Sequence, residues 1–284
     1  MIDVRHLNFT YPGAATQTLK DLNFQIAMGE ILGFLGPSGA GKTTTQKILI
    51  GLLTGFEGEI SVMGKPLQDW GYAYYDRIGV SFELPNHYLK LTALENLAYF
   101  ASLYRGETRD PQELLEMVGL GEDGGLKVAE FSKGMKNRLN VARSLLHKPE
   151  LLFLDEPTAG LDPVNSRRIK NLIAHLKSEG TTIFLSTHDM VVADELSDQV
   201  GFIVDGEIKS MKSPRDLKLE HGQRMVRVEF GLNGTTESRE CPLDGLAENN
   251  EFIATIGRDD LQTIHTQEPT LETIFIEVTG RELG

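Results

Sequence analysis

The stretch "EILGFLGPSGAGKTTTQKILIGLL", residues 30–53, decides the fold. Its pattern predicts a buried strand, then a glycine-rich loop, then a helix. Within it, residues 36–43 ("GPSGAGKT") fit the phosphate-binding pattern G-x-x-x-x-G-K-[ST]. Glycines let backbone N–H groups crowd around an anion, and a helix N-terminus adds about half a positive charge. A chance glycine turn is the alternative, but the position between a strand and a helix favours a nucleotide-phosphate site.

Individual side chains of this loop have separate expected roles. Lys42 is predicted to hold the β- and γ-phosphates, and the Thr43 hydroxyl to ligate Mg²⁺. The residues expected to bind nucleotide here are Gly36, Pro37, Ser38, Gly39, Ala40, Gly41, Lys42, Thr43 and Thr44. Nucleotide and Mg²⁺ are therefore expected together.

A second stretch, "LLFLDEPTAGLDP" at residues 151–163, ends a predicted buried strand in two adjacent acids, Asp155 and Glu156. Burying charge is costly unless a metal, a cation or chemistry compensates it. In enzymes with such a phosphate loop, an acid at the end of a neighbouring strand holds the Mg²⁺. We therefore expect Asp155 to bind the metal and Glu156 to orient or deprotonate the attacking water. A solvated strand end is the alternative.

A second helix start follows at Ser132-Lys133-Gly134, where Ser132 is a plausible N-cap. Its free N–H groups could form a second anion site by the same physics. An ordinary capped surface helix explains this segment equally well when it is taken alone.

The bulk composition limits the partners. The chain has 284 residues, 40% hydrophobic and 24% charged, and a formal net charge of −13, which argues against nucleic acid as the main partner. Residues 215–284 carry 7 basic and 14 acidic residues, a large share of that negative charge. The single cysteine, Cys241, forms no internal disulfide, and neither a signal peptide nor a membrane-spanning run is recognisable. These features predict a cytoplasmic protein.

Along the chain, the predicted elements change character three times. The first thirty residues alternate as antiparallel strands do, residues 84–125 have helical spacing, and strands then alternate with helices as in a mainly parallel sheet. A boundary is predicted at residues 213–222, followed by short strands and a final helix. The predicted fold class is α/β: a P-loop NTPase core with an antiparallel β subdomain, a helical subdomain and a small C-terminal α+β appendix.

With these motifs in this order, residues 1 to about 214 resemble the ATP-binding cassette of an ABC transporter. The resemblance implies that Tyr11 stacks on adenine, although a tyrosine on a strand face is a serious alternative. It implies that His188 of "STHD" contacts the γ-phosphate, although a lone histidine is more often structural. It also implies that Asp162 of "AGLDP" bridges two cassettes.

The segment "FSKGM", residues 131–135, occupies the position of the family's signature motif, usually LSGGQ. The resemblance implies that Ser132 and Gly134 cover a nucleotide held by a second cassette, so that a head-to-tail homodimer or heterodimer encloses two ATP. Lys133 and Met135 depart from the motif. We hypothesise that Lys133 adds positive charge near the opposed γ-phosphate or lies at the seam between subunits.

A further departure is Glu83 in "IGVSFELPN", where the family usually has glutamine. Glutamine at that position touches the metal or the attacking water. We include Glu83 in the expected metal set with Thr43 and Asp155. A side chain that points to solvent at the start of a loop is the alternative.

The expected function is that of an ATP-hydrolysing subunit on the inner face of the cell membrane, with Glu156, His188 and Lys42 as catalytic residues. The expected domains are the cassette, residues 1–214 with a helical subdomain at about 84–147, and an accessory domain at 215–284. Residues 84–130 are expected to form the groove for a separate membrane permease. The ending "EPTLETIFIEVTG" resembles that of ABC-2-type exporters, which favours export.

Two other functions compete with this expectation. A soluble ABC ATPase acting on ribosomes or DNA usually has two cassettes or a long coiled-coil insertion, and the sequence shows neither. A nucleotide-binding regulator without turnover is disfavoured by the intact Glu156 and His188.

Overall fold

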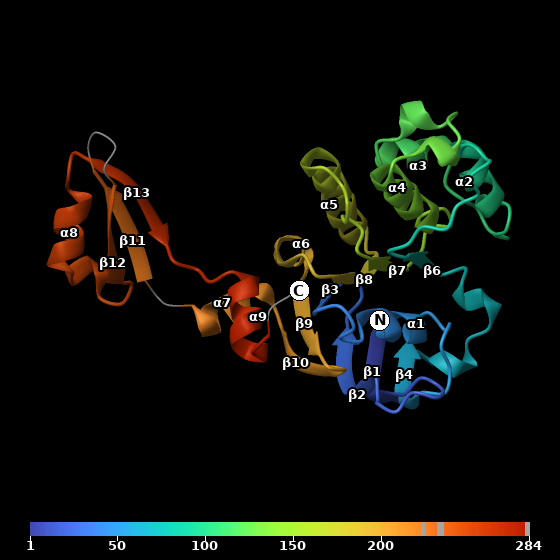
Figure 1. The fold of residues 1–284 in the computed structure, drawn as a ribbon, viewed down its shortest axis with the longest axis horizontal. Helices are drawn as coiled ribbons and strands as arrows, with labels where there is room; N and C mark the ends of the chain where they lie inside the picture. Colours follow the sequence, from blue (N-terminus) through green and yellow to red (C-terminus); the bar gives the residue numbers. More distant parts are fainter. Residues whose placement is uncertain (223–224, 232–235, 282–284) are drawn as a thin grey trace.

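The computed structural model describes residues 1–222, 225–231 and 236–281, and its centre is a six-stranded sheet in the order β10-β9-β3-β8-β7-β6 (Figure 1). The five strands from β9 to β6 are parallel, and β10 is antiparallel to β9. The strands are β3 (Ile31–Leu35), β6 (Ile78–Ser81), β7 (Leu151–Asp155), β8 (Thr182–Thr187), β9 (Gln199–Val204) and β10 (Glu207–Lys212). The prediction of a mainly parallel sheet is confirmed.

Every residue of β3, β7 and β8 is buried, as expected for parallel strands that are covered on both faces. Because these strands are parallel neighbours, their carboxyl ends meet at one edge of the sheet. In open α/β sheets this edge is where ligands bind. The phosphate loop, Asp155 and His188 all lie at this edge, because they follow or end β3, β7 and β8.

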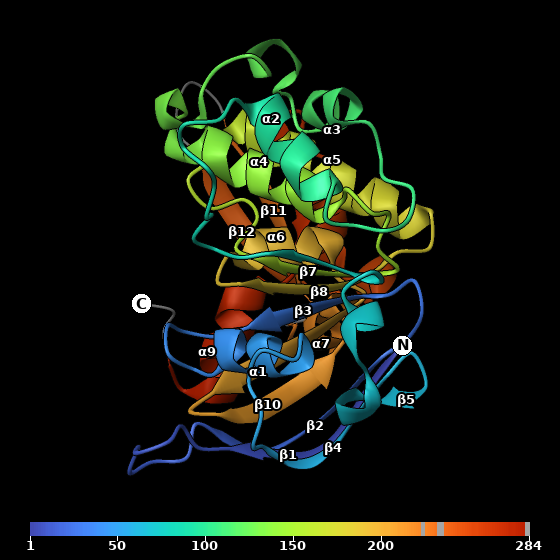
Figure 2. The same cartoon turned by 90° about the vertical axis from the view of Figure 1, so that its right-hand side faces the viewer.

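A second, antiparallel sheet has the order β2-β1-β4-β5. It is built from β1 (Ile2–Phe9), β2 (Leu19–Ile26), β4 (Glu57–Val62) and β5 (Lys65–Pro66). β4 pairs with β1 on one side and with β5, which has only two residues, on the other. Figure 2 shows helix α1 (Lys42–Leu49) between this sheet and the central one. A core that includes Phe24, Phe34 and Phe184 joins the two sheets.

The helical subdomain contains α2 (Ala93–Ala101), α3 (Pro111–Met117) and α4 (Lys133–Ser144) on the other side of the central sheet (Figure 2). Each helix begins at a residue whose side chain accepts hydrogen bonds from the first turn: Thr92, Asp110 and Ser132. Their apolar faces share one core with α5 (Pro163–Ser178). The predicted N-cap at Ser132 is present.

The last helix, α9 (Leu271–Thr279), packs on the cassette. Its residues Leu271, Ile274 and Phe275 are buried in one core with β9 and α6 (Met190–Leu196), together with Leu217 of α7 (Pro214–His221). The accessory domain predicted at residues 215–284 includes α9 and all of α7 except Pro214. The difference arises because the apolar spacing of a helix shows that one face is buried but not which partner buries it.

A small sheet in the order β12-β11-β13 lies apart from the cassette in Figure 1. It comprises β11 (Met225–Phe230), β12 (Glu237–Pro242) and β13 (Leu261–Thr266), and α8 (Asn250–Ile256) covers one face. We propose that the accessory domain is limited to residues 225–266. Within the predicted accessory domain, residues 223–224, 232–235 and 282–284 lie outside the described residues.

Short 3₁₀ turns connect several elements, at Leu67–Asp69, Tyr72–Tyr74, Gly121–Asp123, Val128–Glu130 and Leu246–Glu248. Among the described residues, no helix combines the length and the apolar character needed to cross a membrane.

Candidate nucleotide site

The phosphate loop runs from the end of β3 to the start of α1, and two of its glycines are required by its shape. A Cβ on Gly36 would lie 2.1 Å from the carbonyl oxygen of Ile203. Gly41 has φ +115° and directly precedes α1, a backbone conformation that glycine adopts at little cost. The loop therefore approaches the neighbouring strand β9 closely and turns sharply at the start of α1.

Beside this loop lies a pocket of about 350 Å³. It unites residues from three predicted motifs and from the segment after β6. The lining residues are Ser38, Gly39, Gly41, Lys42, Thr43, Thr44, Glu83, Asp155, Glu156 and His188.

Lys42 is the cation of this pocket. Its Nζ donates hydrogen bonds to the carbonyl oxygens of Gly36 and of Pro37, the latter at 3.1 Å. Burial lowers the pKa of Lys42, while the carboxylates of Glu156, Asp155 and Glu83 act in the opposite direction. The ammonium thus lies among acids that favour its charged form.

Asp155 is almost fully buried at the end of β7, with 4% of its surface exposed. The Ser186 hydroxyl donates a hydrogen bond to its Oδ1. Burial raises the pKa of Asp155, the hydrogen bond from Ser186 lowers it, and the negative charges of Glu156 and Glu83 raise it further. A cation beside this carboxylate would relieve both of the raising effects.

The residues fit a magnesium ion that is held partly by phosphate. Thr43, Asp155 and Glu83 offer hard oxygen ligands at one pocket. No group of three or more histidine, cysteine or acidic side chains within the described parts of the chain could hold a metal ion alone. This agrees with the usual Mg²⁺ site, in which one or two carboxylates act together with substrate phosphates and water.

The carboxylate of Glu156 is held at both oxygens. Oε1 accepts hydrogen bonds from the backbone N–H of His188 at 2.9 Å and lies 2.6 Å from His188 Nδ1. The Thr187 hydroxyl donates to Oε2 at 3.0 Å. Glu156 is 7% exposed and has φ +49°, which is unusual for a residue other than glycine. Such strain persists only where the surroundings fix it, and it concentrates at functional sites.

Tyr11 lies at the edge of the site. Its hydroxyl is 3.2 Å from Thr44 Oγ1, and its ring packs edge-on against Phe9 with a centroid separation of 5.0 Å. The side chain is exposed beside the phosphate loop.

Ser132, Gly134 and Asp162 lie outside this pocket. Ser132 caps α4 through Met135 N–H, and Asp162 caps α5 through the N–H groups of Val164 and Asn165, both at 3.0 Å. These hydrogen bonds from Asn165 and Val164 lower the pKa of the Asp162 carboxyl. Within one chain, the predicted residues therefore form two separate sets.

The beginning of α4 lies beside the loop that connects β7 to α5. A Cβ on Gly134 would lie 3.2 Å from the carbonyl oxygen of Gly160, and the aliphatic stem of Lys133 passes near Gly160. Lys133 itself is exposed.

Three residues with clear contacts in this site were missed by the sequence analysis. Ser186 and Thr187 bind the two acids, and Asn137 of α4 reaches the loop that follows Glu156. Ser186 and Thr187 directly precede His188, so their place at the end of a predicted strand was a usable signal. Asn137 gave no such signal.

Comparison with known proteins agrees with this geometry. Residues 19–159 match the family model described as ABC transporter, and residues 224–268 match the model described as fluoroquinolone efflux ABC transporter C-terminal domain. The chain therefore belongs to the family of ABC transporter ATP-binding cassettes. Its predicted fold class is confirmed.

Two curated relatives are similar over almost their whole length. A fluoroquinolones export ATP-binding protein of Mycobacterium tuberculosis is 54% identical over 284 residues, covering 100% of this chain and 94% of the relative. A bacitracin transport ATP-binding protein of Bacillus licheniformis is 40% identical, covering 98% and 97%. A solved dimeric ATP-binding cassette bound to ADP and phosphate matches with a TM-score of 0.70 and 29% identity, covering 76% of this chain and 99% of that one.

The chain is thus an ATP-binding, ATP-hydrolysing subunit of an ABC transporter of the exporter type. The prediction of this function over a ribosome- or DNA-directed ATPase is confirmed.

Proposed function

We propose that two cassettes bind two ATP with Mg²⁺ between them, and that closure on ATP and opening after hydrolysis drive export through a separate membrane permease. The observation that carries this proposal is the Glu156 carboxylate, which is buried, held by Thr187 and His188, and directed into the same pocket as the phosphate loop. A carboxylate fixed in this way can accept a proton from water without moving.

In this proposal, each residue of the pocket has one task. Lys42 leaves the loop carbonyls to bind the β- and γ-phosphates, and backbone N–H groups of residues 38–39 and 41–44 surround them. Asp155, Thr43 and Glu83 provide ligands for Mg²⁺, whose charge neutralises the phosphates when it is bound. His188 contacts the γ-phosphate while its Nδ1 holds Glu156. Tyr11 stacks on adenine.

Ser132, Gly134 and Asp162 serve the second cassette. They lie outside the pocket of their own chain, at the exposed beginnings of α4 and α5. The N-terminus of α4 has no acidic residue in its first turn, so its N–H groups and Lys133 favour an anion. The similarity of this chain to a solved dimeric cassette supports a pair of cassettes.

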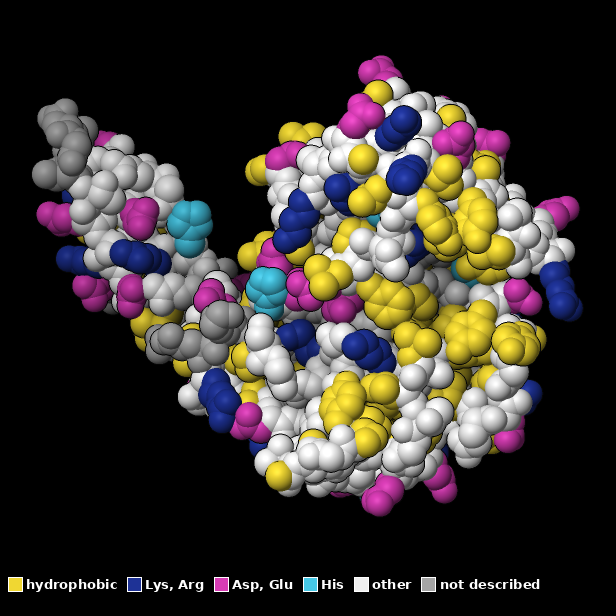
Figure 3. Space-filling model, turned by 45° about the vertical axis from the view of Figure 1, so that its right-hand side comes forward, with side chains coloured by type: hydrophobic (Ala, Val, Ile, Leu, Met, Phe, Trp, Pro, Cys, Tyr) yellow, Lys and Arg dark blue, Asp and Glu magenta, His cyan; other side chains and the backbone are white. Residues whose placement is uncertain are grey.

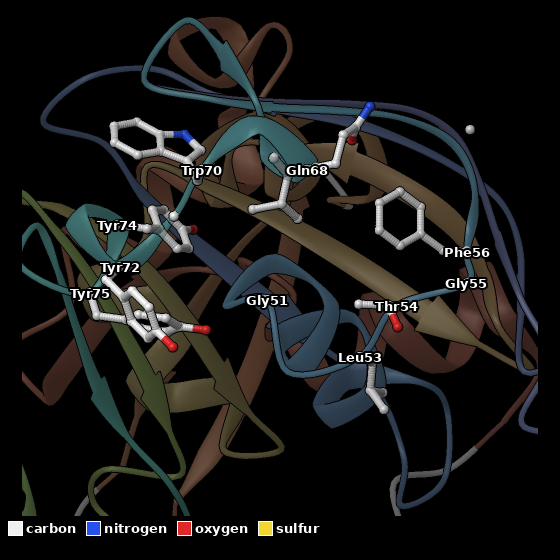
Figure 4. Close-up of a pocket in the computed structure, with 13 residues that line it drawn as sticks. Gly51, Leu53, Thr54, Gly55, Phe56, Gln68, Trp70, Tyr72, Tyr74 and Tyr75 are labelled. Atoms are coloured by element: carbon white, nitrogen blue, oxygen red, sulfur yellow. The ribbon is translucent and has the colours of Figure 1, made fainter.

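The permease is proposed to bind a continuous apolar face. Figure 3 shows hydrophobic side chains gathered at the right of the cassette, where its upper and lower parts meet. Two pockets of about 570 and 610 Å³ lie there and share Tyr75. In the first, the rings of Trp70 and Tyr74 stand opposite Phe56 (Figure 4). Tyr72 at its rim is 93% exposed.

This face is wider than the groove predicted at residues 84–130, because it also includes residues 51–75. Exposed apolar patches of this kind mark protein–protein or membrane contacts. We propose that short helices at the cytoplasmic side of the permease insert apolar residues into both pockets, so that the cassette is peripheral on the inner face of the membrane.

The proposed cargo is a small aromatic antibacterial of the fluoroquinolone class. Support comes from the relative of Mycobacterium tuberculosis and from the C-terminal model matched at residues 224–268. The experiment is co-expression with the membrane protein encoded beside this gene, followed by fluoroquinolone accumulation in cells. Cells with both proteins should accumulate less drug than cells with the Glu156→Gln cassette. Equal accumulation would reject this cargo, and failure to co-purify with the membrane protein would reject the permease.

A further inference from the structure

Helix α4 carries polar side chains along one face, and they bind two different loops, one after β6 and one after β7. Asn137, Asn140 and Arg143 follow one another at three-residue spacing, so they share a face of the helix. Asn140 Nδ2 donates to Ser81 Oγ at 3.0 Å and to the Phe82 carbonyl at 2.7 Å, beside Glu83. Arg143 donates to the Asn86 carbonyl at 2.7 Å. Asn137 reaches the loop of the catalytic acid.

The Asn137 side chain is directed at three backbone carbonyl groups. Its Nδ2 lies 3.4 Å from the oxygen of Glu156, 3.4 Å from that of Pro157 and 3.1 Å from that of Ala159. Because all three are acceptors, the amide must present its NH₂ group to them. The Oδ1 atom is buried and has no hydrogen-bond partner among the described residues. An unpaired buried acceptor is costly, so the donor contacts must compensate for it.

The loop that Asn137 binds has a strained backbone. Glu156 has φ +49°, a conformation that costs a residue with a Cβ free energy. On one side, Glu156 N–H donates to the Ser186 carbonyl at 2.9 Å. On the other side, Asn137 holds the carbonyl groups of Glu156, Pro157 and Ala159. These contacts fix the peptide on both sides of the strained residue.

We propose that Asn137 is a positioning residue for ATP hydrolysis: it holds the loop after β7 so that the Glu156 carboxylate stays against Thr187 and His188. Without the amide, the loop can relax to an ordinary φ, and the carboxylate turns away from the attacking water. This inference rests on the proposed role of Glu156 as the base.

The same contact links the two sets of predicted residues. Ser132 and Gly134 begin the helix in which Asn137 lies one turn further on. A nucleotide bound at the N-terminus of α4 by the second cassette therefore acts on the helix that holds Glu156. In this way Asn137 connects the signature motif to the base of its own chain.

The test is a kinetic cycle with Asn137→Ala and Glu156→Gln in the full-length chain. Asn137→Ala should lower kcat by about tenfold to a hundredfold, because a displacement of about 1 Å can cost about 10²-fold. KM for ATP should change by less than about twofold, since Asn137 lies outside the pocket. In the Glu156→Gln background, the same substitution should lower the residual rate by less than about twofold, because both changes remove one function.

Asn140→Ala is the matched control, because it removes an equal volume and a buried amide from the same helix. Asn140→Ala should lower thermal stability about as much as Asn137→Ala does. Its fold-change in kcat should, however, be the same in the Glu156→Gln background as in the wild type, so that the two effects multiply. If Asn137→Ala also multiplied with Glu156→Gln, or raised KM in proportion to the loss in kcat, the positioning role would be wrong. If Glu156→Gln alone kept the wild-type rate, the proposed base would be wrong instead.

Discussion

The nucleotide site and the accessory sheet are both rich in acidic residues, but they use them in different ways. Asp155 and Glu156 are 4% and 7% exposed and share one cation, Lys42, in their pocket. In the accessory domain, Arg239 pairs with Glu251 at 3.1 Å, with both side chains exposed. Asp260 is only 12% exposed there, but it pairs with Arg258 at 2.7 Å. Buried acids favour a nearby cation or a proton, whereas exposed ion pairs contribute little to the free energy of folding.

The pKa directions show the same contrast. Burial raises the pKa of Asp155, while a hydrogen bond from Arg258 lowers that of Asp260. The position of an acid in the fold, and not its presence in the sequence, decides whether it takes part in chemistry.

The largest effect is expected at Glu156. Glu156→Gln keeps the shape and the hydrogen bond from Thr187 but removes the proton acceptor, so hydrolysis should fall by about 10²–10⁴-fold. ATP binding should be retained, because the phosphate loop is unchanged. Steady-state ATPase rates and nucleotide titrations measure both quantities. Wild-type turnover in this variant would mean that another group is the base.

Asp155→Asn should abolish Mg²⁺-dependent hydrolysis and yet stabilise the protein without nucleotide at neutral pH. The folded-state pKa of Asp155 is raised, so ionisation of this carboxyl disfavours the fold. The stability that the neutral Asp155 carboxyl contributes is fully present below its unfolded-state pKa of 3.8. This stability is lost as the pH rises through the folded-state pKa, because the buried carboxyl then ionises.

The asparagine amide cannot ionise, so the Tm of the Asp155→Asn variant should exceed that of the wild type at pH 7 by about 2 °C or more. The difference in Tm between the two proteins should close as the pH falls towards 4. Thermal unfolding without nucleotide or Mg²⁺ at several pH values checks this. A lower Tm for the amide at pH 7 would show that the buried charge is not costly.

Glu83→Gln should have a smaller effect. Glu83 is exposed at the rim of the pocket and contributes charge to Lys42 and Asp155. If it assists the metal, the Mg²⁺ concentration for half-maximal ATPase activity should rise by about tenfold. If ATPase activity depended on Mg²⁺ concentration in the same way in both proteins, Glu83 would only face solvent and would not contact the metal.

Glu251→Gln should have the smallest effect, since both side chains of its pair with Arg239 are exposed, 64% and 48% respectively. The Tm is expected to change by less than about 1 °C, and ATPase activity should stay at the wild-type level. A large loss of activity would reveal that the accessory sheet acts on the nucleotide site, and the contrast between the two regions would fail.

Local pattern was enough to predict much of the site. The phosphate loop, Asp155 and Glu156 are short contiguous motifs whose strand and helix contexts are visible in the chain, and parallel strand order places them together. Asn137 could not be predicted, because its contacts with residues 156–159 depend on how α4 packs. The element on which α9 packs could not be predicted for the same reason, since the apolar face of α9 fits either domain.

The central claim is that each ATP site is shared by two chains, and a mixing experiment tests it most directly. Lys42→Ala removes the phosphate-loop cation, and Ser132→Arg blocks the N-terminus of α4. Each variant alone should be inactive, because every pair of identical chains has two damaged sites. Mixed chains form one intact site, from the loop of one variant and the helix of the other, so ATPase activity should return. No recovery from two folded variants that still associate would contradict the shared site.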